Sequence, residues 1–472
     1  MKVIKGHVIV AAKPELEVLP GVKTAEIKNG KVVAIPHTLE AVRLLRNLQI
    51  PAPSPIHYNY SWAGPHRPMD HQRITSDMCT IYQRMFVLNG MGTGKTLSAA
   101  WAMDYLMRIG QVRRALIISP RSTLKDVWGT TLYLNFPHIS QEILRGDRKL
   151  CVEKLNRMTR VCIINPESVR VRVDLLRLHE FDMVIIDELA QIARNKTATY
   201  KAIRTITDRA TWVWGMTGTP IPNAPSDAYN QIDLVRPNSI GMAYGSFRDS
   251  VMVKVDQFKW VPRENAEETV ARYMRPSVRF SIDDCIDLPP VTYVDLKVEL
   301  TQEQKKHYKA LLEQSVTDIN GIRVDAVNAA VLTSKLIQAA CGAVYGDDRA
   351  VAKLDIKSRY EAVIETIESC DEKVIIFVPF TSVILRLKEE LVKDGYGVRV
   401  IDGSVTDNQR ATIFNEFRSL PRKDLQILLA HPRTMSHGIS LTVASTIIWY
   451  APYPSYDATM HANSRICRPG QA

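Results

Sequence analysis

A hydrophobic run, a glycine-rich turn and an amphipathic stretch follow one another without a break between residues 85 and 107. The turn ends in Gly94-Lys95-Thr96, so the segment predicts a strand, a phosphate-binding loop and a helix in that order. Glycines let backbone N–H groups wrap phosphates, and the helix N-terminus adds partial positive charge. We expect Lys95 to reach the β- and γ-phosphates of a nucleoside triphosphate and Thr96 to ligate Mg²⁺.

The strict phosphate-loop pattern requires glycine at position 89, and this chain has Asn89 there. A chance glycine-rich turn between a strand and a helix is therefore the alternative. On the first interpretation the nucleotide-binding residues are those of the whole loop: Asn89, Gly90, Met91, Gly92, Thr93, Gly94, Lys95 and Thr96.

A second apolar run, residues 183–186, ends in Asp187 and Glu188. Its valine and isoleucines suit a parallel strand covered on both faces, and ligands of such folds bind at the carboxyl ends of the strands. We expect Asp187 to hold Mg²⁺, through water, and Glu188 to polarise the attacking water. An Asp-Glu pair alone is usually a solvated turn, but its place after an apolar strand and downstream of Gly-Lys-Thr favours catalysis.

These segments, in this order, resemble the superfamily 2 (DEAD/DEAH-like) helicases and translocases. Among these, they are most similar to the Snf-type DNA-dependent ATPases, the family of chromatin remodellers and annealing helicases. The resemblance runs from about Pro65 to the last residue. Besides the two segments above, it rests on residues 67–72, 115–124 with Trp128, 161–167, 214–223, 402–410, 437–444 and 461–471.

The resemblance implies roles for further residues. Gln72 would read adenine, although a surface glutamine in a turn is the everyday alternative. Arg465 and Arg468, three residues apart and so on one helix face, would reach the γ-phosphate, where developing charge makes an arginine most valuable. Coupling or nucleic-acid contacts would come from Pro120, Arg121, Thr217, Gly218, Thr219, Gly403, Arg410 and Gly438.

Three departures from the family pattern stand out. Ala190 follows Glu188-Leu189 where relatives carry a histidine that links the two lobes, so coupling must use other groups. His461 replaces the usual glutamine. The chain also stops one residue after Gln471, where relatives continue with a strand and a helix, so we expect either a truncated product or a second lobe that ends early.

Composition and charge narrow the class of protein. A chain of 472 residues suits two or three domains, and 46% hydrophobic with 24% charged residues is typical of a soluble globular protein. Seven scattered cysteines indicate reduced thiols in a cytosolic setting. The net charge of +11 favours a polyanionic partner. We expect a DNA-binding monomer with no membrane partner, in a bacterial cytoplasm, with the compact layout of versions carried by bacteriophages.

Residues 1–55 predict a small α+β module. Short strands are expected at 8–10, 24–28 and 31–35, the last two joined by an Asn29-Gly30 turn, and a helix at 38–48. The module faintly resembles the accessory domain that precedes the motor in annealing helicases; a stabilising appendage is the alternative. Because it carries no motor motif, we expect basal hydrolysis to survive its removal.

The rest of the chain predicts an α/β fold with two RecA-like parallel-sheet lobes in tandem, the arrangement of P-loop NTPase motors. The first, ATP-binding lobe would span 56–275. The second, C-terminal helicase lobe would span 276–472, with a helical insertion at about 301–340 and strands at 373–378, 398–401, 425–430 and 446–450. Trp128, Trp212 and Trp214 would either stack on bases or pack in a core.

The function expected from these patterns is an ATP-hydrolysing, Mg²⁺-dependent DNA translocase or helicase that moves along duplex or branched DNA. A strand-separating DNA or RNA helicase is the first alternative. A decayed, non-catalytic nucleic-acid-binding scaffold is the second, and the presence of Lys95, Thr96, Asp187 and Glu188 argues against it.

Overall fold

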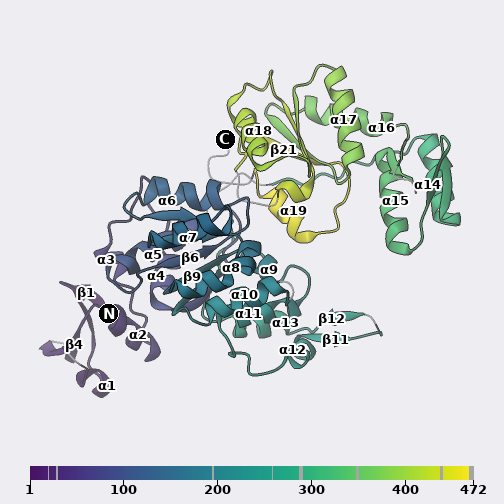
Figure 1. Ribbon diagram of the computed structural model, residues 1–472. Helices are drawn as coiled ribbons and strands as arrows, with labels where there is room; N and C mark the ends of the chain where they lie inside the picture. Colours follow the sequence, from purple (N-terminus) through teal and green to yellow (C-terminus); the bar gives the residue numbers. More distant parts are fainter. Residues whose placement is uncertain are drawn as a thin grey trace. The chain divides into compact units, whose positions relative to one another are not determined.

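The chain folds into two compact units, Met1–Ile286 and Asp287–Ala472 (Figure 1). The computed structural model describes residues 1–19, 21–27, 30–193, 196–257, 259–285, 291–346, 350–435 and 440–466. Each unit is built around its own parallel sheet.

A small antiparallel sheet and two helices open the first unit. The strands are β1 (Lys2–Ile4), β2 (His7–Ala11), β3 (Lys23–Ile27) and β4 (Gly30–Pro36) in the order β1-β2-β4-β3, and the helices are α1 (Pro14–Glu17) and α2 (Leu39–Asn47). The Thr38 hydroxyl caps α2 by accepting the Ala41 backbone N–H at 3.2 Å. β2, β3, β4 and α2 lie where the sequence predicted them; Asn29, of the predicted turn, lies outside the described residues.

The large sheet of the first unit has seven parallel strands in the order β13-β5-β10-β9-β6-β8-β7. They are β5 (Arg84–Val87), β6 (Ala115–Ile118), β7 (Gln141–Ile143), β8 (Val161–Ile164), β9 (Met183–Asp187), β10 (Trp212–Met216) and β13 (Ser277–Val278). Alternate residues along β6, β8 and β9 enter two different hydrophobic clusters, so both faces of the sheet are covered. Their unbroken apolar sequences follow from that double burial.

Helices cover the two faces of this sheet. They are α3 (Ile56–Asn59), α4 (Asp70–Ile81), α5 (Lys95–Arg108), the π-helix η1 (Leu124–Gly129), α6 (Thr130–Asn135), α7 (Arg148–Asn156), α8 (Pro166–Leu178), α9 (Leu189–Ile192), α10 (Ala198–Thr207), the 3-10 turn η2 (Pro225–Asp227), α11 (Ala228–Val235), α12 (Tyr244–Val251) and α13 (Ala266–Tyr273). A short hairpin, β11 (Met252–Lys254) with β12 (Trp260–Pro262), follows α12 (Figure 1).

The sequence-based boundary after Arg275 falls too early. Strand β13 pairs with β5 at the edge of the large sheet. The chain then runs on beside the loop after β5, because Leu88 N–H donates to the Val278 carbonyl at 2.8 Å and Gly90 N–H to the Phe280 carbonyl at 2.7 Å. Residues 277–282 therefore belong to the first unit.

The second unit contains a small α+β body and a four-stranded parallel sheet. The body comprises α14 (Gln302–Gln314), β14 (Val316–Ile319), β15 (Ile322–Asp325), α15 (Ala329–Cys341), β16 (Ala343–Tyr345) and β17 (Val351–Lys353). It has a hydrophobic cluster of its own, in which Leu311, Ile319 and Val344 are fully buried. The helical insertion expected at about 301–340 thus contains two helices and the hairpin β14–β15, and the body continues beyond it to Lys353.

The sheet of the second unit has the order β19-β20-β18-β21, all parallel. Its strands are β18 (Lys373–Phe377), β19 (Val398–Ile401), β20 (Ile427–Ala430) and β21 (Ala444–Trp449), close to their predicted positions. The helices are α16 (Lys357–Glu368), α17 (Thr381–Lys393), α18 (Asp407–Ser419), the 3-10 turn η3 (Pro432–Met435) and α19 (Tyr456–Asn463). The two sheets are the two predicted RecA-like lobes.

Candidate functional site

Three strands of the large sheet end side by side and bring the main motifs together. In the register of β5, β10 and β9, Val87 lies beside Met216, and Met216 lies beside Asp187. One edge of the sheet therefore holds the start of the glycine-rich loop, the start of the loop at Thr217 and the Asp187 side chain. This is the edge at which open parallel sheets bind ligands.

The glycine-rich loop has the backbone geometry that its sequence predicts. Gly92 and Gly94 both have a φ of +79°, in the left-handed region that glycine tolerates. A Cβ on Gly94 would also lie 2.2 Å from Nε2 of Gln72, so any other residue would displace the Gln72 amide and strain the backbone. Lys95 Nζ donates to the carbonyls of Asn89 and Gly90, each at 3.0 Å, and its ammonium thus lies across the loop.

Asn89, the departure from the strict pattern, fastens this loop to two neighbouring segments. Its side chain is 1% exposed. Its Nδ2 donates to the Thr75 hydroxyl at 2.8 Å, and its Oδ1 accepts the Phe280 backbone N–H at 3.1 Å. A glycine could make neither hydrogen bond. Asparagine at this position of the motif therefore fixes the loop at a point where glycine would leave its backbone free.

Gln72 and its neighbour His71 support the loop from helix α4. Gln72 Nε2 donates to the Thr93 carbonyl at 3.3 Å, and its Oε1 accepts the Met69 N–H at 3.0 Å. His71 Nε2 donates to the same Thr93 carbonyl at 2.8 Å. Adenine recognition by Gln72 stays a prediction. The sequence did not indicate that His71 and Gln72 would both bind the Thr93 carbonyl, because only the folded structure brings these residues together.

The Asp187 carboxylate is buried and held by three donors. Its Oδ2 accepts the Ser119 hydroxyl at 3.1 Å and the Trp128 indole N–H at 2.9 Å, and its Oδ1 accepts the Glu188 N–H at 3.1 Å. A carboxylate has about four acceptor positions, so Asp187 keeps capacity for a metal-bound water. Carboxylate and hydroxyl oxygens are donors that Mg²⁺ accepts beside waters and phosphates, and the roles of Thr96 and Asp187 as its ligands stay a prediction.

Trp128, Trp212 and Trp214 are all buried, with exposures of 0%, 1% and 0%. Base stacking, one of the two interpretations from sequence, is therefore wrong for these indoles. Trp128 has a different role, because it orients Asp187 from the π-helix η1.

Glu188 has a backbone φ of +51°, which is costly for a residue with a side chain. Such strain amounts to roughly 1–3 kcal/mol and tends to persist at functional positions. Glu188 is also the residue that starts helix α9, next to the carboxylate of Asp187.

The loop after β10 packs directly against the glycine-rich loop. Thr217 is fully buried, and its hydroxyl accepts the Thr219 N–H at 3.3 Å. A Cβ on Gly218 would lie 3.1 Å from Met91 Cγ and 3.6 Å from Lys95 Nζ. Movement of either loop would therefore displace the other. Pro120 and Arg121 follow the neighbouring strand β6, with Arg121 exposed.

In the second unit, Gly403 follows the buried Asp402, whose Oδ1 accepts the Ser404 N–H at 2.9 Å. Arg410 lies on α18 and its Nη2 donates to the Val405 carbonyl at 3.4 Å. The expected nucleic-acid contact Gly438 and its neighbour His437 lie outside the described residues.

Arg465 is 1% exposed, and its Nε donates to the His461 carbonyl at 3.0 Å. The expectation that Arg465 lies on a helix is wrong, because α19 ends at Asn463. Arg465 lies in the turn that follows, where its carbonyl accepts the Leu441 N–H at 2.9 Å. Arg468 lies outside the described residues.

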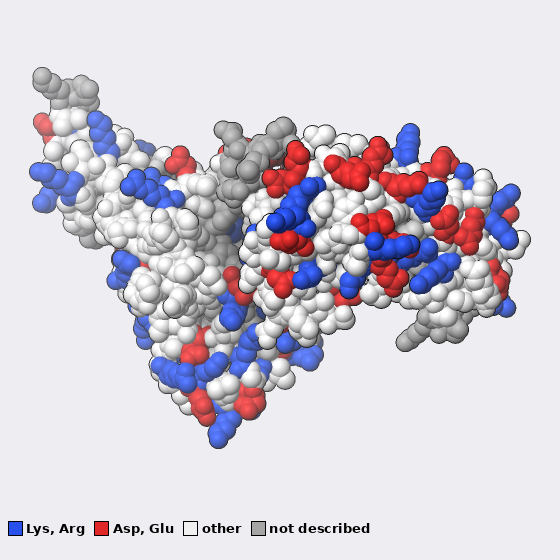
Figure 2. Space-filling view, turned by 90° about the horizontal axis from the view of Figure 1, so that it is seen from above, with Lys and Arg blue, Asp and Glu red and all other residues white. Residues whose placement is uncertain are grey.

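Lysine and arginine outnumber aspartate and glutamate by 61 to 50 in the whole chain. On the face in Figure 2, basic and acidic side chains are interspersed over much of the surface. Within the described part of the chain, no helix is long and apolar enough to cross a membrane.

Comparisons with known proteins agree with this geometry. The model of the SNF2-related domain matches residues 84–342, and that of the helicase conserved C-terminal domain matches residues 358–470. An uncharacterized ATP-dependent helicase of Mycoplasma genitalium is 26% identical over 396 residues, which cover 81% of this chain and 36% of the relative. Protein p41 of Acyrthosiphon pisum secondary endosymbiont phage 1 is 23% identical, with 81% of this chain and 84% of the relative covered.

Among solved structures, the helicase domain of Pyrococcus furiosus Hef superposes with a TM-score of 0.51 at 15% identity, covering 86% of this chain and 94% of that one. This likeness supports the two-lobe fold alone. The chain spans 35% to 36% of the length of the first curated relatives that it matches.

Proposed function

Because the chain belongs to the SNF2-related domain family, we propose that it is a nucleic-acid-dependent ATPase that moves along duplex or branched DNA. One observation carries the proposal. One edge of the large sheet brings together the glycine-rich loop with Lys95, the Thr217–Thr219 loop and the Asp187 carboxylate. Trp128 and Ser119 already orient that carboxylate by hydrogen bonds. A binding scaffold would have no need of that convergence.

The roles of the residues follow from their contacts. Lys95 Nζ now donates to two carbonyls of its own loop, and bound ATP would replace these acceptors with β- and γ-phosphate oxygens. Thr96 and Asp187 would hold Mg²⁺, which neutralises charge developing on the phosphates. Glu188 would orient and deprotonate the attacking water, and Arg465 and Arg468 of the second unit would stabilise the charge of the transferred phosphoryl group.

Coupling to DNA would pass through the loops that touch the phosphate loop. Gly218 lies against both Met91 and Lys95, so the arrival or loss of the γ-phosphate would move the Thr217–Thr219 loop. Pro120, Arg121, Gly403, Arg410 and Gly438 would contact the DNA backbone. The net charge of +11 supports a polyanionic partner.

The setting is part of the same proposal. The chain would act as a monomer in the cytoplasm of a bacterium, encoded by the bacterium or by a phage. Relatives from Mycoplasma and from a phage support this origin.

A displacement gel distinguishes walking on duplex DNA from strand separation. With ATP and Mg²⁺, the protein should displace a triplex-forming strand and leave a simple tailed duplex intact. Lys95→Ala should abolish displacement, and Lys149→Ala, which removes an exposed lysine of α7, should not change it. Efficient unwinding of the tailed duplex without triplex displacement would replace the translocase with the helicase alternative.

A further inference from the structure

Helix α4 contacts the glycine-rich loop with its first half. His71 and Gln72 donate to the Thr93 carbonyl, and the Thr75 hydroxyl accepts from Asn89 at 2.8 Å. One residue later, the Ser76 hydroxyl donates to the Ser98 carbonyl in α5 at 2.9 Å. The position of α4 therefore determines where the loop and the start of α5 lie.

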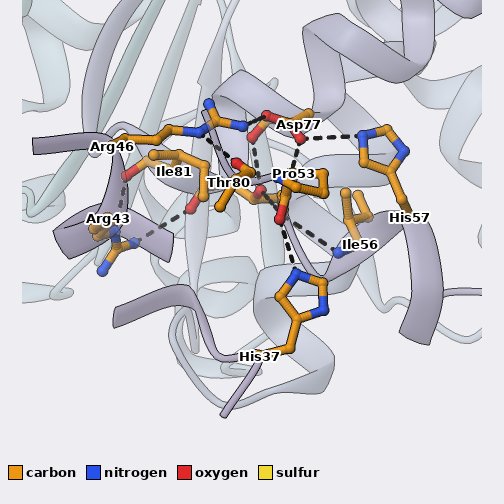
Figure 3. Close-up of polar contacts among 11 residues, drawn as sticks. His37, Arg43, Arg46, Pro53, Ile56, His57, Asp77, Thr80 and Ile81 are labelled. Atoms are coloured by element: carbon orange, nitrogen blue, oxygen red, sulfur yellow. Dashed lines mark hydrogen bonds and ion pairs between the residues drawn. The ribbon is translucent and has the colours of Figure 1, made fainter. Parts of the chain in front are cut away.

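The second half of α4 contacts the N-terminal module and the segment that follows it (Figure 3). Arg46 of α2 pairs with Asp77 Oδ1, and Asp77 Oδ2 accepts the Ser54 N–H at 2.7 Å and His57 Nε2 at 3.1 Å. Arg43, also on α2, donates to the carbonyls at the end of α4, Thr80 at 3.2 Å and Ile81 at 2.8 Å. Each of these donors lies in residues 43–57, before the first motor motif.

Asp77 makes this junction sensitive to the loss of a partner. Its side chain is only 8% exposed, and that of Arg46 is 19% exposed. Burial alone would raise the pKa of Asp77, but the hydrogen bond from His57, the charge of Arg46 and the Ser54 N–H together lower it. A buried charge that loses one partner is strongly unfavourable, so loss of Arg46 with the rest of the module in place would strain the contacts that hold this end of α4.

Apolar packing joins the same parts. Leu39, Val42 and Leu45 of α2 are buried in one continuous cluster that also contains Val87 at the end of β5 and Trp101 of α5. The N-terminal module therefore shares the core of the nucleotide-binding lobe.

The geometry points to a regulatory role for the N-terminal module: it sets nucleotide affinity through helix α4, with Asp77 as the positioning residue. Residues 43–57 hold one end of α4, and the other end holds the phosphate loop through Thr93 and Asn89. A partner or a substitution that shifts α2 would thus alter ATP binding without touching the nucleotide. This inference rests on the proposed function, and it adds an effect on nucleotide affinity to the prediction that basal hydrolysis survives removal of residues 1–55.

The test compares two largely buried carboxylates, each paired with an arginine, in the full chain. Asp77→Asn keeps the volume and removes the charge. Asp233→Asn is the control, because the Asp233 side chain is also largely buried, with 24% exposed, and is paired with an arginine, Arg204, but it joins α10 to α11. For each variant we would measure the dissociation constant of fluorescent ADP with Mg²⁺, KM and kcat for ATP, and the unfolding midpoint.

Asp77→Asn should weaken ADP binding and raise KM by about tenfold, within the ~10²-fold that a misplacement of about 1 Å can cost. Asp233→Asn should lower the unfolding midpoint and leave the affinity for ADP unchanged. If Asp77→Asn does not fold, Arg46→Gln and Arg46→Lys provide a second comparison. Arg46→Gln should bind ADP more weakly than wild type, and Arg46→Lys, which keeps the positive charge, should bind ADP more tightly than Arg46→Gln.

Equal ADP affinity in wild type and folded Asp77→Asn, or in the two Arg46 variants, would overturn the inference and leave the proposed function intact. Failure of the wild type to bind ADP or ATP would instead overturn the proposed function itself.

Discussion

Trp128→Phe tests whether the indole orients the metal-binding carboxylate. The indole N–H donates to Asp187 at 2.9 Å in a fully buried position. A hydrogen bond to a charged group contributes about 1.5–3 kcal/mol, and the smaller ring leaves a cavity of a few tens of Å³ that costs about 1 kcal/mol more. We expect unfolding to become easier by ~3 kcal/mol. A misoriented Asp187 that stabilises the transition state of hydrolysis by ~1.4 kcal/mol less would lower kcat about tenfold.

The matched control is Trp101→Phe, because Trp101 is equally buried but donates to a neutral acceptor, the Ala63 carbonyl, at 2.7 Å. It should lose ~2 kcal/mol of stability, since a neutral hydrogen bond contributes only about 1 kcal/mol. The assay is steady-state ATP hydrolysis over a Mg²⁺ titration, at a temperature at which both variants are folded. Trp128→Phe should need more Mg²⁺ and turn over more slowly, and the control should match wild type. Equal kcat and equal Mg²⁺ dependence in the two variants would refute the orienting role.

Four further outcomes are expected. Glu188→Gln should bind ATP normally and lose ~10²-fold or more in single-turnover hydrolysis, because it keeps the shape and removes the base; wild-type turnover would exclude this role. Arg468→Ala should lower kcat by up to ~10³-fold with unchanged ATP affinity, and an unchanged kcat would exclude an arginine finger there. DNA affinity should fall linearly with salt on logarithmic axes, with a slope independent of base sequence; a flat response in titrations would contradict backbone tracking. The lowered pKa of Asp77 stabilises the fold above its unfolded-state pKa, and that stability is lost as pH falls through the folded pKa. Urea unfolding should therefore show a weaker acid dependence below about pH 4 in Asp77→Asn than in wild type.

The strand ends of the site could be predicted from sequence because local patterns carry them. Unbroken apolar runs such as residues 161–164 and 183–186 specify buried parallel strands, and parallel strands place their carboxyl ends at one edge. The glycine-rich turn predicted a loop that glycines allow to wrap tightly, and Gly92 and Gly94 both have left-handed backbone there.

Other parts of the site depend on contacts between residues far apart in the chain. Trp128 is 59 residues from Asp187, and Asn89 is 191 residues from Phe280. No periodicity signals such pairs. Strand β13 escaped prediction for the same reason, since its two residues are recognisable as a strand only by their pairing with β5. Arg465 lies in a turn and its carbonyl accepts a hydrogen bond from Leu441, a contact between distant residues that helical spacing could not indicate.

The ATP hydrolysis rate, measured with no nucleic acid, single-stranded DNA, duplex DNA and RNA in parallel, tests the central claim most directly. We predict slow hydrolysis without nucleic acid, a large stimulation by duplex or branched DNA, a smaller one by single strands, and loss of all stimulated activity in Lys95→Ala. A wild-type protein that hydrolyses no ATP, or hydrolyses it at one rate under all four conditions, would contradict a DNA-driven motor.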